Sequence, residues 1–256
     1  GERMSKGKLR VERDGPVGRL VLDNPERRNA IGADMWRAIA PAMAGFNADA
    51  SIRCIVIRGE GTQAFAAGAD ISEFEKNRSS EGDVKDYEAA TSAAHHAIES
   101  SPKPVIALIH GFCVGGGLAV ALSCDLRYAD ASSRFAIPAA RLGLGYGVHG
   151  MGRLVATVGH AAAREIMFSA RRYDAGEALA MGLVNRVLPD AELDAYVRKV
   201  ALELAANAPM TIAASKAVIN ALAEPRGDFS AAEAAVARCM KSEDYVEGRR
   251  AFMEKR

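Results

Sequence analysis

A short apolar run, followed a few residues later by three consecutive glycines, constrains the fold of this chain most. The run Pro104–Ile109 (PVIALI) is too short and too rich in β-branched residues for a helix, so it predicts a buried strand. After Gly115–Gly117 the pattern predicts a helix near Gly116–Ser123 and a second strand near Leu126–Ala129. A strand, a crossover helix and a further strand form a βαβ unit, whose strands are parallel.

The same alternation occurs nearer the N-terminus. The β-rich runs Val17–Leu22 and Cys54–Arg58 flank Ala33–Asn47, in which apolar residues recur at helical spacing. From about Gly150 onward, strand patterns nearly vanish and helical ones dominate. We therefore expect an α/β core over residues 1–200 and a helical region over residues 201–256. The later helices are predicted near Ala161–Ser169, Ala175–Met181, Ala191–Asn207, Met210–Leu222, Phe229–Met240 and Asp244–Glu254.

Charge and composition exclude several classes of function. The 33 Lys and Arg residues nearly balance the 32 Asp and Glu residues, without a long run of one sign, so we expect no nucleic-acid partner. No apolar stretch approaches the roughly 18 residues of a membrane span, and the first ten residues lack the apolar segment of a signal peptide. The four cysteines lack CxxC spacing, which argues against a metal site. A cytoplasmic protein is expected.

The three glycines place backbone N–H groups at the start of a helix, where the helix dipole also favours negative charge. A glycine has no Cβ, so a ligand can approach its backbone closely. The alternative is that Gly115–Gly117 only permit tight packing between strand and helix. A second run of small residues, Phe65–Ile71 (FAAGADI), follows another strand, and two such loops can converge at one edge of a sheet.

Several ordered motifs together resemble the crotonase superfamily, also called the enoyl-CoA hydratase/isomerase family. They are FAAGADI, the run from Lys103 to Ala129, PERRNAI (Pro25–Ile31), DAGEALAMGLVNRV (Asp174–Val187) and SEDYVEGRRAFMEKR (Ser242–Arg256). The resemblance covers almost the whole chain. It implies a spiral of ββα turns with a C-terminal helical trimerisation region, and a homotrimer or a dimer of trimers. It also implies an acyl-CoA substrate, with coenzyme A as part of that substrate and no separate cofactor.

The resemblance further implies an oxyanion hole formed by the backbone N–H groups of Ala69 and Gly116. Such donors stabilise negative charge that develops on the thioester oxygen. Coenzyme A would be held by main chain at Ala67, Asp70 and Ile71, by Arg27 or Arg28, and by Phe252 and Lys255 of the last helix. For the three cationic side chains, plain surface charge is the alternative.

Two family positions that carry glutamate in hydratases are occupied here by Ala119 and Ala139. Ala119 follows Gly116 by one helical turn, so its side chain should face the thioester. Hydration of an enoyl group needs side chains that orient water and transfer its proton, which a methyl group cannot do. The resemblance therefore indicates an enolate-stabilising scaffold, whereas the two alanines argue against the usual hydration mechanism.

The loop Leu142–Gly152 offers substitutes for the missing acids. Tyr146 can donate a proton, His149 can act as a base, and Arg141 can hold a carboxylate on the acyl group. A decarboxylase branch of the family has a similar tyrosine loop, but it has histidine at the position of Ala69 and an acid at that of Ala119. The alternative for Tyr146 and His149 is a gating or solvated loop.

Two functions are therefore weighed. The first is an acyl-CoA lyase or isomerase, including decarboxylase-like or hydrolase-like variants that use the loop of Tyr146 and His149. The second is a catalytically silent protein that binds acyl-CoA. Elsewhere, His95 and His96 lie in a polar helical pattern (Val84–Glu99), for which a surface role is expected.

Overall fold

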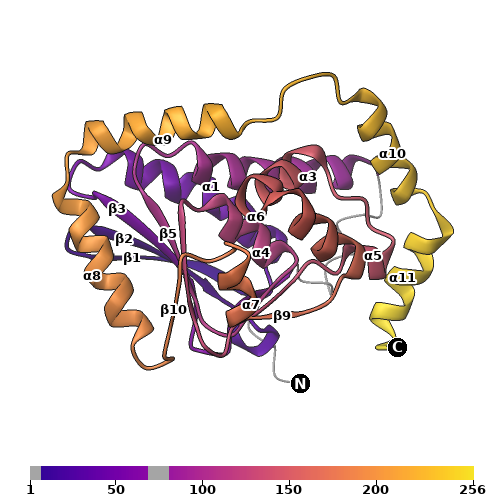
Figure 1. Ribbon diagram of the computed structural model, residues 1–256, viewed down its shortest axis with the longest axis horizontal. Coiled ribbons are helices and arrows are strands. Elements are labelled where there is room, and N and C mark those ends of the chain that lie inside the picture. The colour runs from indigo at the N-terminus through magenta and orange to yellow at the C-terminus, as the bar shows by residue number, and fades with distance from the viewer. Residues whose placement is uncertain (1–6, 69–80) are drawn as a thin grey trace.

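The computed structural model describes residues 7–68 and 81–256, with two β-sheets at its centre (Figure 1). In spatial order, the larger sheet consists of β1 (Lys8–Asp14), β2 (Val17–Asp23), β3 (Cys54–Gly59), β5 (Val105–Ile109), β7 (Leu126–Asp130) and β10 (Arg186–Leu188). The smaller sheet consists of β4 (Ala64–Ala67), β6 (Phe112–Val114), β8 (Arg134–Ala136) and β9 (Tyr173–Asp174). The strands pair in parallel, except that β1 is antiparallel to β2 and β9 to β8.

Consecutive strands alternate between the two sheets. The pairs β3 and β4, β5 and β6, and β7 and β8 each place one strand in the larger sheet and one in the smaller. The first two pairs are followed by α3 (Glu81–Glu99) and α4 (Gly116–Ser123), and the third by α5 (Ala139–Leu142) and α6 (Val148–Ser169). This repeat confirms the expected α/β class and its ββα spiral.

The two faces of the larger sheet are covered by different helices. On one face, the apolar stripe of α1 (Ala33–Ala48) packs on the sheet and on α3, and it includes Met35, Ile39 and Met43, as the helical spacing predicted. On the other face, α8 (Leu193–Ala206) buries Leu193 and Val197 against residues of β3, β5 and β7. Both faces are buried, which explains why β5 is apolar at every position.

The chain after residue 147 differs from the sequence prediction in one helix and two short strands. The helix expected from Ala161 begins earlier, because α6 starts at Val148, within the segment that was predicted to be a loop. Gly159 interrupts α6 with a φ of 82°, which divides it into two helical parts. The short strands β9 and β10, with α7 (Ala175–Ala180) between them, continue the sheets after residue 150.

The C-terminal helices α9 (Pro209–Ala223), α10 (Ser230–Met240) and α11 (Glu243–Met253) extend along the outside of the core (Figure 1). On α9, Lys216 alone is buried, and no residue of α10 is buried. The Nζ of Lys216 donates to Asp125 Oδ2 at 2.9 Å and to the carbonyl oxygens of Lys103 and Ile98 at 3.1 and 3.3 Å. This buried, fully paired ammonium anchors α9 to the core. The division at residue 200 stays a prediction.

None of the helices within residues 7–68 and 81–256 has the length and apolar character needed to cross a lipid bilayer.

A buried histidine joins α8 to the sheet. His110 follows β5, and its side chain is 3% exposed. Nδ1 lies 2.5 Å from Asp130 Oδ2, and Nε2 lies 2.7 Å from Asp194 Oδ1 at the start of α8. Arg58 forms a further ion pair with Asp194. Burial lowers the pKa of His110, but the hydrogen bonds and charges of the two carboxylates outweigh burial and leave that pKa above its ordinary value.

This arrangement predicts a pH-dependent stability. A histidine whose pKa is raised by folding stabilises the protein below its unfolded pKa of about 6.5, and the contribution is lost as pH rises through the folded pKa. His110→Gln keeps hydrogen-bonding capacity without the charge. Urea denaturation should therefore show the largest loss in the free energy of unfolding, relative to wild type, near about pH 5.5, and a smaller loss by about pH 8.5. A loss that grows over this range would contradict the assignment.

Candidate active site

Three parallel strands of the smaller sheet end side by side. Ala67 of β4 lies opposite Val114 of β6, and Val114 lies opposite Ala136 of β8. Beyond these strand ends, a Cβ placed on Gly115 would lie 3.6 Å from the Cα of Gly68 and 3.9 Å from Pro138 Cδ. The two small-residue loops therefore converge with the segment before α5, at the carboxyl edge where α/β sheets bind ligands.

Backbone conformation explains one of the three glycines, and close packing explains another. Gly115 has a φ of 57°, which disfavours residues with a Cβ. A Cβ on Gly117 would lie 2.2 Å from the carbonyl oxygen of Ala66, so only glycine allows α4 to approach β4 this closely. The packing alternative therefore applies to Gly117, whereas the left-handed backbone conformation accounts for Gly115. These two explanations concern Gly115 and Gly117, and they do not account for the N–H of Gly116.

The backbone N–H of Gly116 is available as a donor. Gly116 is the first residue of α4, no side chain caps this helix, and within the described chain the Gly116 N–H has no hydrogen-bond acceptor. The neighbouring Gly115 N–H is already used, because it donates to the Ala136 carbonyl at 2.9 Å. A free N–H at a helix N-terminus favours an oxygen that carries negative charge.

One face of α4 is open at this edge. Of its eight residues, Gly116 and Ala119 alone are not buried, and they lie one turn apart. Ala139, the first residue of α5, is 3% exposed and follows Pro138. Because both positions carry alanine, neither Ala119 nor Ala139 can supply an acid or a base at this edge.

The loop that contains Arg28 is hydrogen-bonded to the end of β4. The Ala67 N–H donates to the Arg28 carbonyl at 3.0 Å, and the Ile31 N–H donates to the Gly68 carbonyl at 3.0 Å. Buried Asn29 holds this loop further, since its Nδ2 donates to the carbonyls of Glu60 and Ala64. The Ala67 N–H is therefore not free for a ligand.

The guanidinium of Arg28 lies over the ring of Phe112 in β6, 4.4 Å from its centroid, whereas Arg27 is only half-buried. Arg28 therefore lies beside the strands that end at the site. The side chains of Phe252 and Lys255, at the end of α11, are exposed. Their contact with coenzyme A stays a prediction. Three further predicted residues, Ala69, Asp70 and Ile71, lie outside the described residues.

Tyr146 and His149 have different surroundings. The half-buried ring of Tyr146 packs against the main core, and burial raises the pKa of its hydroxyl while the charge of Arg153 opposes that shift. The hydroxyl of Tyr146 therefore stays protonated at physiological pH. The side chain of His149 is 69% exposed, with Nε2 3.7 Å from Glu99 Oε2. Arg141 is exposed.

The C-terminal helices hold the loop that carries Tyr146. A Cβ on Gly143 would lie 2.5 Å from the Tyr245 nitrogen of α11, and one on Gly145 would lie 2.7 Å from the Val236 carbonyl of α10. Gly248 of α11 likewise packs on the backbone of Leu142. Close backbone packing therefore positions this loop.

The expected surface role of His95 is wrong. Its ring stacks edge-on against buried Trp36, with centroids 5.4 Å apart, and its Nδ1 lies 2.9 Å from Ser123 Oγ on α4. Burial, with smaller contributions from Arg153 and His149, lowers the pKa of His95 to about 3. The helical period contained a signal, because His95 lies next to Ala94 and three residues before Ile98, both fully buried.

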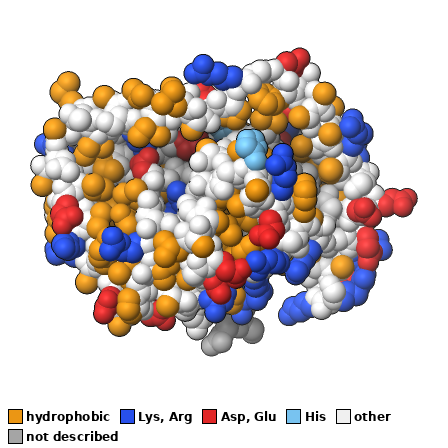
Figure 2. All heavy atoms as spheres, in the orientation of Figure 1, with side chains coloured by type: hydrophobic (Ala, Val, Ile, Leu, Met, Phe, Trp, Pro, Cys, Tyr) orange, Lys and Arg blue, Asp and Glu red, His pale blue; other side chains and the backbone are white. Residues whose placement is uncertain are grey.

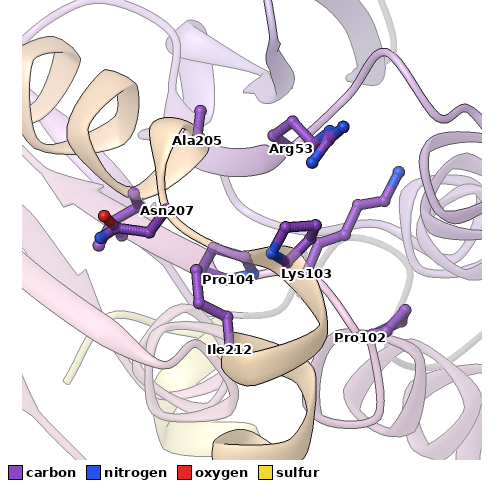
Figure 3. A pocket seen from close by; sticks show the side chains of 9 residues that line it. Arg53, Pro102, Lys103, Pro104, Ala205, Asn207 and Ile212 are labelled. Atoms are coloured by element: carbon purple, nitrogen blue, oxygen red, sulfur yellow. The ribbon is translucent and has the colours of Figure 1, made fainter.

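A hollow lies away from the glycine edge, where β3 and β5 of the larger sheet begin (Figure 3). Its lining includes Arg53, Lys103 and Pro104. Lys103 Nζ already donates to the carbonyls of Phe46 and Asp49, and Arg53 Nε donates to the Ala50 carbonyl. These cations serve the fold, so the glycine edge remains the candidate active site.

Comparisons with known proteins agree with this geometry. The model of the enoyl-CoA hydratase/isomerase family matches residues 12–256. A short-chain-enoyl-CoA hydratase of Clostridium acetobutylicum is 33% identical over 248 residues, which cover 96% of this chain and 94% of the relative.

Solved structures are similar over nearly the whole chain. An enoyl-CoA hydratase/carnithine racemase from Magnetospirillum magneticum is 38% identical with a TM-score of 0.82, covering 98% of this chain and 94% of that one. A methylmalonyl-CoA decarboxylase in complex with 2-nitronate-propionyl-CoA is 29% identical with a TM-score of 0.89, covering 97% and 96%. The chain therefore belongs to the enoyl-CoA hydratase/isomerase family, the crotonase superfamily, and is an enzyme of acyl-CoA chemistry.

Proposed function

We propose that this enzyme is an acyl-CoA lyase or isomerase that stabilises a thioester enolate with the backbone N–H groups of Gly116 and Ala69. The observation that carries the proposal is the free Gly116 N–H, at the start of α4 and at the edge where three parallel strands end. Coenzyme A is part of the substrate. The enolate oxygen accepts hydrogen bonds from donors already in place, so little reorganisation accompanies the reaction.

The adenine and phosphates of coenzyme A are proposed to lie along the Arg28 loop and the end of β4. Arg28 is exposed and fixed over Phe112, which suits contact with a phosphate. Main chain beyond Ala67, at Asp70 and Ile71, would contact the adenine, and Arg27, Phe252 and Lys255 complete the proposed set. Since the Ala67 N–H is occupied, its carbonyl is the group left to contact the ligand.

Ordinary hydration is not the proposed reaction, because Ala119 and Ala139 cannot activate water. Tyr146 is the proposed proton donor, since its raised pKa keeps the hydroxyl protonated. His149 is exposed and lies beside Glu99. Decarboxylation suits a site that has a proton donor but no strong base. Breaking the bond between the α-carbon and the carboxylate releases carbon dioxide and leaves the enolate, which then takes a proton from the donor. The likeness to methylmalonyl-CoA decarboxylase supports this second candidate, in which Arg141 would hold the substrate carboxylate.

The chain is also proposed to form a homotrimer or a dimer of trimers through its C-terminal helices. Met210, Val218, Ile219 and Leu222 of α9 are between 60% and 85% exposed. Figure 2 shows apolar side chains along the edge that α9 occupies in Figure 1. An apolar helix face of this kind is typical of a surface that another subunit covers.

Replacing Gly116 with proline tests the oxyanion donor. Proline is well accepted at the first position of a helix, so the change removes the N–H and preserves α4. We expect kcat to fall by about 10²–10³-fold, the typical cost of losing one such donor. Glu243→Pro, at the exposed first position of α11, is the control and should keep its activity. Wild-type kcat in Gly116→Pro would contradict the proposal.

A panel of thioesters distinguishes the reactions. We expect slow hydration of crotonyl-CoA, followed by its absorbance, and faster release of carbon dioxide from methylmalonyl-CoA. Tyr146→Phe should lower kcat for the preferred substrate by about 10²–10⁴-fold. Tyr196→Phe is the matched control, because Tyr196 packs beside Tyr128 on the α8 side of the larger sheet. Hydratase-like rates with crotonyl-CoA would contradict the proposal, and binding without turnover would favour the silent alternative.

Sedimentation tests the assembly. We expect a mass three or six times the 27.1 kDa of the chain. Leu222→Lys places a charge on the apolar face of α9 and should dissociate the assembly, whereas Val11→Lys, on exposed β1, should not. A monomeric wild-type protein would rule out the proposed assembly.

A further inference from the structure

A set of unpaired buried polar atoms gathers at one place. Within the described chain, four buried side-chain atoms lack a hydrogen-bond partner: Trp36 Nε1, Glu99 Oε1, and Nε and Nη1 of Arg153. Arg153 Nη1 lies 2.5 Å from Glu99 Oε1, but this ion pair lacks hydrogen-bond geometry. Trp36 contacts His95, whose neighbouring charges include Arg153. Unpaired buried polar groups are few in native proteins, so their concentration here needs an explanation.

This polar cluster, defined as Trp36, His95, Glu99, Ser123 and Arg153, adjoins the candidate active site. Ser123 lies one turn after Ala119 on α4, and its hydroxyl donates to the Ala119 carbonyl at 3.0 Å. On the other side, the charge of Arg153 acts on Tyr146. The cluster therefore connects the open face of α4 to the Tyr146 loop. Ser123 is seven residues beyond Gly116, about 10 Å along the helix.

The hydrogen bonds assign the state of His95. Ser123 has one hydroxyl hydrogen, which it donates to Ala119, so its oxygen accepts from His95 Nδ1–H. Burial lowers the pKa of His95 to about 3, so the ring is neutral and its Nε2 carries an acceptor lone pair. The cluster thus offers donors on Trp36 and Arg153 and acceptors on His95 and Glu99. Its charges sum to zero.

We propose that the polar cluster binds a hydroxyl group carried by the acyl chain several carbons beyond the thioester. This inference rests on the acyl-CoA substrate of the proposed function. A hydroxyl both accepts from Arg153 and donates to His95, so it pairs atoms of both kinds. A methyl group would leave those atoms unpaired, a carboxylate would lie beside Glu99, and an ammonium would lie beside Arg153.

Calorimetry with matched ligands tests the proposal. The ligands are 4-hydroxybutanoyl-, 6-hydroxyhexanoyl- and 8-hydroxyoctanoyl-CoA, each compared with the unsubstituted thioester of the same length. At one of these lengths, the hydroxyl should lower Kd by about tenfold, as expected for a buried hydrogen bond to a charged or well-oriented partner. The matching length reports the distance from the thioester to the cluster.

Variants identify the acceptor. His95→Phe keeps an aromatic ring against Trp36 but lacks the acceptor on Nε2. It should therefore abolish the preference for the hydroxylated thioester, while unsubstituted thioesters still bind. His96→Phe, the exposed neighbour on α3, is the matched control and should retain the preference. If His95→Phe does not fold, Ser123→Ala removes the bond that orients His95 and should weaken the same preference.

Three outcomes would overturn the inference. Equal affinities at every length would show that the cluster holds only water, and the proposed function would stand. An undiminished preference in both His95→Phe and Ser123→Ala would remove His95 from the assignment. If neither type of thioester bound the wild-type protein, the inference and the proposed function would both fail.

Discussion

The close approach of α4 to β4 is the constraint on which the candidate site depends. Gly117 leaves no room for a Cβ against the Ala66 carbonyl, and Gly115 turns the chain in a left-handed conformation directly before the helix. Together they bring the first turn of α4 to the edge where β4, β6 and β8 end in parallel. A side chain at Gly117 would push α4 away from β4, and one at Gly115 would strain the turn that leads to the Gly116 N–H.

This geometry favours stabilisation by the backbone over chemistry by side chains. The open face of α4 presents an N–H at Gly116 and a methyl group at Ala119. Ala139 adds a second methyl group where the family resemblance expects an acid. A backbone donor stabilises negative charge but cannot transfer a proton, which is why the proposed function assigns proton donation to Tyr146. Packing by α10 and α11 positions that loop, which couples the C-terminal helices to the chemistry.

Buried polar groups are treated differently in different parts of the molecule. Lys216 and His110 are fully paired, and both tie a helix of the later chain to the sheet. Glu99 and Arg153 form a half-buried ion pair, in which three buried atoms make no hydrogen bond. A fully satisfied network fixes a fold, whereas unpaired atoms beside an open site are suited to a ligand.

The sequence alone determined the βαβ alternation and the start of α4 at Gly116, because strand length, helical period and glycine placement are local properties. It also determined the alanines at positions 119 and 139. Only the tertiary structure decided that the two glycine-containing loops converge, that Gly117 serves packing, that His95 contacts Trp36 and Ser123, and that α6 begins at Val148. These features depend on contacts between segments distant along the chain, such as Ala66 with Gly117 and His95 with Ser123, which no local pattern encodes.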